Sequence, residues 1–141
     1  MKENIHIAIR EKVLNIRDIV SHINSDSTGA ENIFVGKVRD HSNGQTIKKL
    51  EYSAYVPMAE KELLAIAEEA LKKFDIDKIA IEHRIGLLAI GEVAVCIAVS
   101  ARHRKDTFSA TQFIIDTIKE RVPIFKKEFT ESGEVWVNST A

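Results

Sequence analysis

The sequence predicts one α+β domain over residues 1–141, with helices packed against a mostly antiparallel sheet. Three observations lead to this fold class. Two long segments, 57–74 and 104–122, place apolar residues at helical spacing. Short alternating or apolar segments typical of strands lie before, between and after them. With 141 residues, 45% of them hydrophobic and 29% charged, the chain is long enough for one domain with its own core.

The N-terminal part of the chain mixes strand and helix patterns. Segment 6–10 (HIAIR) predicts a strand, 13–23 (VLNIRDIVSHI) a helix and 29–39 (GAENIFVGKVR) a second strand. Segment 40–45 (DHSNGQ) is rich in residues that tolerate left-handed backbone geometry, so we expect a turn. Segment 47–55 (IKKLEYSAY) is the next strand, and the short connection predicts that it runs antiparallel to the strand before it.

The first long helix is expected at 57–74, because Pro57 fits a first helical turn. Its apolar stripe comprises Leu63, Ala67, Ala70 and Phe74. Strands follow at 77–86 and 92–101. The second of these is apolar on both faces, which favours a central place in the sheet.

The second long helix is expected at 104–122, where Pro123 ends it. Its expected stripe comprises Phe108, Ile115, Ile118 and Val122. Strands at 123–130 and 134–138, joined through Ser132 and Gly133, close the chain. The order is β-α-β-β-α-β-β-α-β-β.

Composition and motifs exclude several functions. The formal net charge of −1 argues against a protein that coats nucleic acid. Charges occupy the N-terminus where a signal peptide is apolar, and the run VAVCIAV is too short to span a membrane, so we expect a cytoplasmic protein. The single cysteine, Cys96, excludes an internal disulfide and is expected in the core. Trp136 is expected to be a packing anchor.

Known catalytic motifs do not explain the chain either. GLLAIGE lacks the Gly-Lys-Ser/Thr that completes a P-loop, and the serine-elbow and catalytic-cysteine signatures do not occur. The five histidines show neither HxH nor HExxH spacing, so we expect no metal site.

Four basic clusters are candidates for an anion-binding site. They comprise Lys37, Arg39 and His41; His83 and Arg84; Arg102, His103, Arg104 and Lys105; and Lys119 with Lys126 and Lys127. The third precedes a helix, whose first turn attracts anions. In the fourth, strand alternation sends one of the two adjacent lysines inward toward Lys119. Crowded ammonium groups lower one another's pKa, which suits proton transfer, although a lysine in a last helical turn also complements the helix dipole.

Several long motifs, in order over most of residues 29–137, resemble the large, catalytic subunit of molybdopterin synthase. They read FVGKVRDHSNG, LEYSAYVPMAE, HRIGLLAIGE, VSARHRKDTF, IKERVPIFKKE and SGEVW. The resemblance implies an α/β hammerhead-type fold and a homodimer that binds two small ubiquitin-like sulfur carriers, forming a heterotetramer. The carrier's Gly-Gly tail would bring a thiocarboxylate, whose sulfur passes to cyclic pyranopterin monophosphate to form the dithiolene of molybdopterin. It implies no cofactor or metal in this subunit.

The resemblance also implies site residues. Lys119 and Lys126 would be catalytic, and the substrate would be bound by Lys37, Val38, Arg39, His103, Arg104, Lys119, Lys126, Lys127 and Glu128. Cationic groups suit two anions that must meet. The 15 residues from Arg104 to Lys119 span about 22 Å of helix, which predicts that two protomers share each site.

The chain departs from the family pattern at Phe125, where a tryptophan is common and where we expect the phenylalanine to keep an aromatic wall. It also ends soon after Trp136, which puts a contribution of C-terminal residues to the pocket in doubt. Two alternatives stay open. A module that only binds an anionic metabolite would have no use for Lys119 together with Lys126. A nucleic-acid binder should show exposed aromatics among its basic residues, and only 6% of residues are aromatic.

Overall fold

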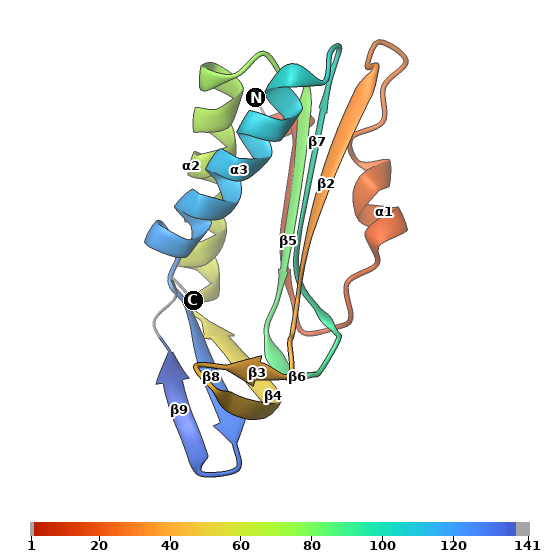
Figure 1. The fold of residues 1–141 in the computed structure, drawn as a ribbon. Helices are drawn as coiled ribbons and strands as arrows, with labels where there is room; N and C mark the ends of the chain where they lie inside the picture. The colour runs from red at the N-terminus through yellow and green to blue at the C-terminus, as the bar shows by residue number, and fades with distance from the viewer. Residues whose placement is uncertain (1, 138–141) are drawn as a thin grey trace.

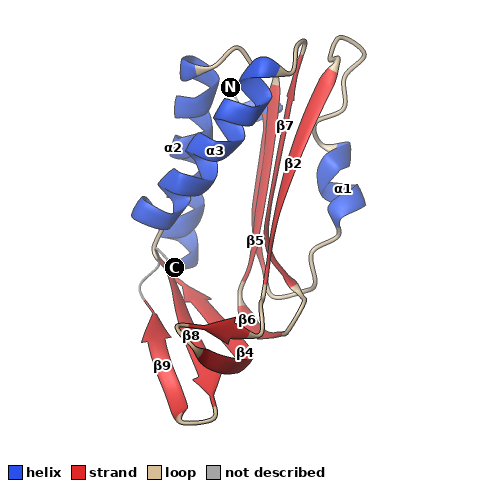
Figure 2. Ribbon diagram, in the orientation of Figure 1, coloured by secondary structure: helices blue, strands red, loops and turns tan. Residues whose placement is uncertain are grey.

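The computed structural model describes residues 2–137, which form two sheets joined at one end (Figures 1 and 2). The four-stranded sheet has the order β1-β5-β7-β2, and the five-stranded sheet has the order β3-β4-β8-β9 with β6 paired to β4. The strands are β1 (Ile5–Arg10), β2 (Ala30–Lys37), β3 (His41–Ser42), β4 (Gln45–Ala54), β5 (Lys78–Arg84), β6 (Gly86–Ala89), β7 (Val93–Ala101), β8 (Ile124–Thr130) and β9 (Gly133–Val137). The helices are η1 (Lys2–Asn4), α1 (Ile16–Ser21), α2 (Val56–Lys73) and α3 (Lys105–Arg121).

The four-stranded sheet is covered on both faces, with α2 and α3 on one face and α1 on the other (Figure 1). Alternate residues of β7 point to opposite faces of the sheet and pack into two separate hydrophobic cores. Ile97 and Val99 pack toward α2 and α3, whereas Cys96 and Ala98 pack toward α1. The strand lies between β5 and β2, so its expected central place and the buried position of Cys96 are confirmed. Apart from the parallel β1–β5 pair, the strand pairs within residues 2–137 are antiparallel, as predicted.

The five-stranded sheet, which we call the small sheet, lies at the lower end of the molecule in Figure 2 and contains β3 and β4, the two strands that follow β2 in the chain. Asn43 and Gly44 adopt positive φ angles of 51° and 77° in the β3–β4 turn, as the composition of segment 40–45 predicts. Segments 29–39 and 47–55, expected to run antiparallel to each other, are not paired with each other, because β2 pairs with β7 while β4 pairs with β3, β6 and β8. A short connection keeps the end of one strand close to the start of the next, but the second strand can still pair within another sheet. The strand β6 was not predicted.

Helix α1 is shorter than the expected segment 13–23. The side chain of Asn15 accepts a hydrogen bond of 3.0 Å from the backbone N–H of Asp18, so the helix begins after Asn15. Leu14 is buried in the chain before the cap. An apolar residue at helical spacing can therefore join the core without being helical.

The exposed side of α3 corrects the predicted stripe. Phe108 is 62% exposed, whereas Thr111 and Thr117 are buried and donate their hydroxyl protons to carbonyl groups one turn earlier. Threonines that satisfy their hydroxyls in this way can line a buried helix face. Trp136 is also 62% exposed, so its expected role as a packing anchor is wrong. The last residue of the predicted strand 134–138 and the tail after it lie outside the described residues.

Within residues 2–137, no helix has both the length and the apolar composition that crossing a membrane requires.

Candidate active site

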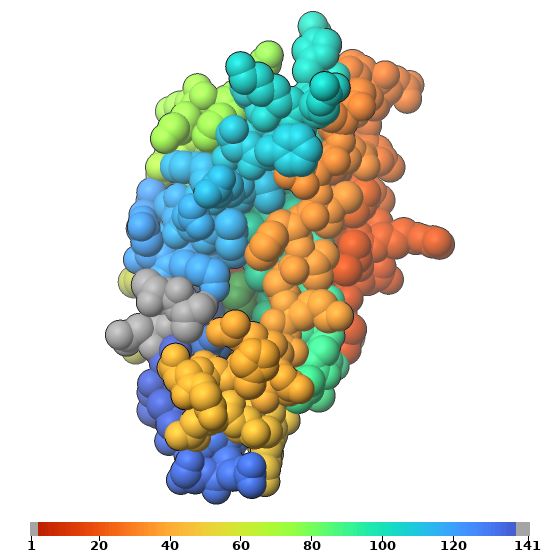
Figure 3. Space-filling view, in the orientation of Figure 1, coloured from red at the N-terminus to blue at the C-terminus, as the bar shows by residue number. Residues whose placement is uncertain are grey.

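A cavity of about 320 Å³ lies where the two sheets meet α3. Figure 3 shows the surface hollowed between the blue α3 and the orange β2, beside the yellow β3–β4 hairpin. We call it the main cavity. Its lining residues are Phe34, Gly36, Lys37, Arg39, His41, Ile47, Leu50, Tyr52, Ala94, Val95, Ile115, Lys119, Lys126 and Glu128. A volume of this size fits a small organic ligand.

Strand β8 places one of its two adjacent lysines in the main cavity. Lys126 pairs with Tyr52 of β4 in the sheet register, and both side chains line the cavity. Lys127 points to the other face, where its Nζ lies 3.5 Å from Glu51 Oε1 and 5.1 Å from the ring centroid of Trp136. The expected alternation of the two lysines is therefore confirmed.

A bulge in β2 brings two neighbouring residues to the cavity wall. The register with β7 shifts between Gly36 and Lys37, and both residues line the main cavity. A Cβ at Gly36 would lie 2.7 Å from Cγ1 of Val95, so only glycine fits without a shift of that neighbour. Arg39 follows in the loop that leads to β3.

The lysines of the main cavity are electrostatically perturbed. Burial, followed by the charge of Arg39, lowers the pKa of Lys119. Burial also lowers the pKa of Lys126, and the charges of Lys119 and Arg39 add to this effect while Glu128 opposes it. We expected mutual repulsion of the ammonium groups as the cause, but burial is the larger one. In this site a lysine can therefore take up or release a proton at a pH closer to neutral than a free lysine can.

A second, smaller cavity of about 60 Å³ lies behind the two lysines, and we call it the rear chamber. It shares Tyr52, Val95, Ile115, Lys119 and Lys126 with the main cavity. Its other lining residues are His83, Ile118, Val122 and Ile124. The rear chamber is thus an apolar extension of the site with a few polar groups.

Two neutral polar residues face the rear chamber. Burial lowers the pKa of His83 to about 4, and burial raises the pKa of Tyr52 to about 12. Their rings meet edge to face with centroids 5.1 Å apart. Nδ1 of His83 lies 2.8 Å from the carbonyl oxygen of Arg84. A carbonyl only accepts, so Nδ1 carries the proton and Nε2 is left as an acceptor.

The predicted site residues fall into three groups. The main cavity is lined by Lys37, Arg39, Lys119, Lys126 and Glu128. Val38 and Lys127 do not line it, because Val38 is buried in the core of the small sheet and Lys127 lies on the far face of β8. His103 and Arg104 line a separate surface hollow at the start of α3, with Gly29, Ala30, Arg102, Lys105 and Phe108.

Phe125 does not form the expected aromatic wall. It is 43% exposed and contacts Tyr55 with ring centroids 6.0 Å apart, on the same side of β8 as Lys127. The aromatic residues that line the main cavity are Phe34 and Tyr52, which were not predicted. Alternation along segment 47–55 could have indicated Tyr52, since Leu50 and Tyr52 lie on one face of a strand.

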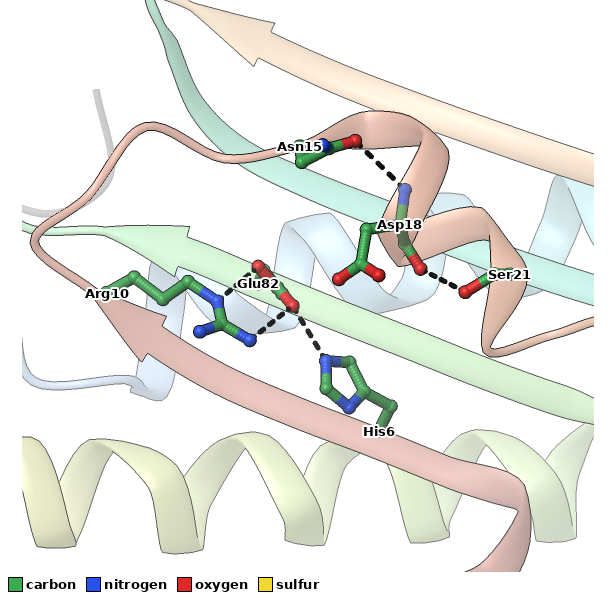
Figure 4. A network of polar contacts seen from close by, with 6 residues as sticks. All are labelled: His6, Arg10, Asn15, Asp18, Ser21 and Glu82. Carbon is green, nitrogen blue, oxygen red and sulfur yellow. Dashed lines mark hydrogen bonds and ion pairs between the residues drawn. The ribbon is translucent and has the colours of Figure 1, made fainter.

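A polar cluster outside the site joins β1, β5 and α1. Glu82 is buried and accepts hydrogen bonds from Arg10 Nε at 2.8 Å and Nη2 at 3.2 Å, and its Oε2 lies 2.7 Å from His6 Nε2 (Figure 4). Burial alone would raise the pKa of Glu82, but these hydrogen bonds more than offset it and the pKa is lowered.

His22 brings a second imidazole to this cluster, so the fold gathers possible metal ligands that sequence spacing did not indicate. The rings of His6 and His22 stack with centroids 3.6 Å apart and planes at 5°. Their nitrogen lone pairs therefore lie in parallel planes and do not converge, and Arg10 binds both oxygens of Glu82. This geometry is that of an ion pair whose carboxylate is buried and whose guanidinium is partly exposed.

Comparison with known proteins adds to this geometry. The molybdopterin synthase catalytic subunit of Pyrococcus abyssi is 42% identical over 136 residues, which cover 96% of this chain and 92% of that protein. The Bacillus subtilis protein of the same name is 43% identical over 129 residues, covering 92% and 82%. The structure of molybdopterin synthase from Staphylococcus aureus superposes with a TM-score of 0.86 at 39% identity, covering 97% of both chains.

A structure from Helicobacter pylori, a complex of subunits 1 and 2 of molybdopterin-converting factor, has a TM-score of 0.74 and 19% identity, and covers 94% of this chain and 89% of its own. That likeness concerns the fold, and the hammerhead-type α+β class is confirmed by these neighbours. The model of the MoaE protein family matches residues 9–121. With most of its length matched in sequence and in fold, the chain belongs to the MoaE protein family.

Proposed function

We propose that the chain is the catalytic subunit of a molybdopterin synthase, a cytoplasmic sulfurtransferase of molybdenum cofactor biosynthesis. Its substrates are cyclic pyranopterin monophosphate and a small ubiquitin-like carrier that ends in a Gly-Gly thiocarboxylate. The observation that carries this proposal is the main cavity, in which Lys37, Arg39, Lys119 and Lys126 surround a volume of about 320 Å³. A cationic pocket of that size suits an anionic pterin and the end of an acidic tail.

The cations have distinct roles in this proposal. Arg39 suits a bidentate contact with the phosphate, because a guanidinium presents two parallel N–H groups. Lys119 and Lys126 stabilise the negative charge that develops on the acyl oxygen and on the leaving alkoxide. Their lowered pKa makes proton transfer to that alkoxide easier than from an ordinary lysine. Glu128, buried beside them, limits the net positive charge of the pocket.

The hollow at the start of α3 supports a site shared between protomers. Arg104 and Lys119 are 15 residues apart along α3, about 22 Å, and they line different hollows of one chain. In a two-fold homodimer, His103 and Arg104 of one chain would complete the main cavity of its partner. Two carriers bound to such a dimer give the heterotetramer.

A mixed-dimer experiment tests the shared site. Inactive Arg104→Ala and inactive Lys119→Ala chains are co-expressed with different tags, and the heterodimer is isolated. One of its two sites then has both residues intact, so we expect about half of the wild-type activity per dimer. Heterodimers that bind the carrier and show no activity would refute the shared site.

Reconstitution tests the function itself. The purified protein is mixed with a thiocarboxylated carrier and cyclic pyranopterin monophosphate, and molybdopterin is followed through its fluorescent oxidation product. We expect product with the thiocarboxylate and none with the carboxylate form of the same carrier. A wild-type protein that binds both substrates and makes no product would exclude the proposed activity.

A further inference from the structure

The rear chamber has the size and lining of a water site. Its volume of about 60 Å³ exceeds the roughly 10–15 Å³ that one water molecule needs, and it is far smaller than a pocket for a pterin. Four of its lining residues, Tyr52, His83, Lys119 and Lys126, carry polar groups, and the others are aliphatic. Buried water is stable where two to four polar partners meet.

The polar groups of the rear chamber differ in what they offer a water molecule. Nε2 of His83 can only accept a hydrogen bond, since Nδ1 donates to the carbonyl of Arg84. The phenol of Tyr52 can donate or accept. The two lysines and Tyr52 line both the rear chamber and the main cavity. A water held by His83 and Tyr52 would therefore lie beside the two lysines and face the main cavity, where the substrates react.

The proposed reaction requires a water molecule. When the thiocarboxylate sulfur bonds to a carbon of the pterin, a carbon–oxygen bond at that carbon breaks and the oxygen leaves with the electron pair. The acyl carbon of the carrier stays attached to the sulfur. The acyl–sulfur bond then breaks as the oxygen of water bonds to the acyl carbon. The carrier leaves as a carboxylate, the sulfur stays on the pterin as a thiolate, and two protons are released. No oxidant or reductant is needed.

We propose that the rear chamber holds this water and that His83 and Tyr52 are its positioning residues. The inference rests on the proposed sulfur transfer. Nε2 of His83 accepts a hydrogen bond from one O–H of the water, and the phenol of Tyr52 donates a hydrogen bond to one lone pair of the water oxygen. The second lone pair of that oxygen then points toward the acyl carbon. His83 stays neutral because burial, and after it the charge of Lys119, oppose its protonation, while its bond to the Arg84 carbonyl favours it. The charged groups of the rear chamber are Lys119 and Lys126, and Arg39, Asp116 and Glu128 act on them from nearby.

The proton released by the water passes to the neutral form of one of the two lysines. A lysine whose pKa is lowered has more of this neutral form at a given pH than a free lysine has. His83 itself, with a pKa of about 4, is a weak base and acts by orienting the water. Loss of either positioning residue should therefore slow the cleavage of the acyl–sulfur bond and spare its formation.

A single-turnover experiment separates the two steps. Wild type, Tyr52→Phe, His83→Leu and His83→Gln are mixed with thiocarboxylated carrier and cyclic pyranopterin monophosphate, quenched in acid and analysed by intact mass spectrometry. Tyr52→Phe keeps the ring against His83, so its fold is retained. Tyr55→Phe is the matched control, because Tyr55 is 66% exposed and does not line either cavity.

We expect the carrier–pterin acyl conjugate to accumulate in Tyr52→Phe and His83→Leu, with its breakdown slowed at least tenfold and its formation within about threefold of wild type. His83→Gln, which keeps an acceptor, should break the conjugate down faster than His83→Leu. An unchanged ratio of conjugate to product in Tyr52→Phe and His83→Leu would overturn the inference. Equal slowing of both steps would also overturn it, since a structural role predicts that. A wild type without sulfur transfer would instead contradict the proposed function and the inference with it.

Discussion

Lys126 and Lys127 provide a matched pair of substitutions, because the two lysines are adjacent in β8 and point to opposite faces of the sheet. Lys126→Ala removes a cation from the main cavity, and Lys127→Ala removes one from the far face. We expect the first change to reduce turnover and the second to reduce stability.

The magnitudes follow from the contacts. A preorganised donor at a developing oxyanion contributes about 2.7–4 kcal/mol, so Lys126→Ala should lower kcat by roughly 10²–10³. Lys127 lies over the rings of Trp136 and Phe129 at 5.1 and 5.3 Å and pairs with two carboxylates, of Glu51 and Glu134, at 3.5 Å. Exposed contacts of these kinds contribute about 0.5–1 kcal/mol or less each, so Lys127→Ala should cost about 1–2 kcal/mol of unfolding free energy.

The assay measures molybdopterin formation at saturating carrier, together with urea unfolding of each variant. Lys126→Ala should keep the unfolding free energy within about 1 kcal/mol of wild type, because burial disfavours its ammonium in the folded state. Lys127→Ala should keep kcat within about threefold, since it touches neither cavity. If Lys127→Ala lost as much turnover as Lys126→Ala, the assignment of the two faces would be refuted.

Three further outcomes are expected. Lys119→Ala should lose nearly all turnover while its urea midpoint changes little, since a lysine in the last helical turn contributes about 0.3–1 kcal/mol; wild-type turnover would remove it from the mechanism. Cys96→Ala should keep substantial activity with a loss of about 1 kcal/mol in urea unfolding, because the sulfur comes from the carrier; a folded variant that binds both substrates without product would contradict this. Arg10→Met leaves the buried carboxylate of Glu82 with His6 alone and should cost about 1–3 kcal/mol at neutral pH, less than for a fully buried pair because the Arg10 side chain is 44% exposed. These bonds lower the pKa of Glu82, so their stabilisation is present above the unfolded carboxyl pKa and declines as pH falls through the folded value; a difference between wild type and Arg10→Met that did not shrink in acid would argue against it.

The sequence pattern predicted most helices and strands, because these elements depend on residues that lie close together in the chain. Pro57 lies in the first turn of α2 and Pro123 follows the end of α3, and a continuous apolar run marked β7 as buried on both faces. The alternation in β8 also predicted that one lysine of the pair would face inward, since the side-chain direction in a strand depends only on parity.

The long-range parts of the site could not be predicted in this way. Val38 and Lys127 belong to the matched motifs, but β2 ends in a bulge that sends its neighbours to the cavity and buries Val38 in the small sheet's core. Tyr52 and His83 are 31 positions apart, and the pairing of β4 with β6, the strand that directly follows β5, brings their rings together. His103 and Arg104 line a different hollow from Lys119, because they lie at the start of α3 and Lys119 lies in its last turn.

By itself, the sequence determined the family, the order of most strands and helices and the cationic character of the site, because these depend on residue identity and on spacing along the chain. Only the tertiary structure decided which strands share a sheet, which basic residues line one cavity, and that burial more than mutual repulsion lowers the pKa of Lys119 and Lys126. The physical reason is that burial and charge proximity are properties of atoms brought together from distant segments, and each depends on how β2, β4, α3 and β8 pack.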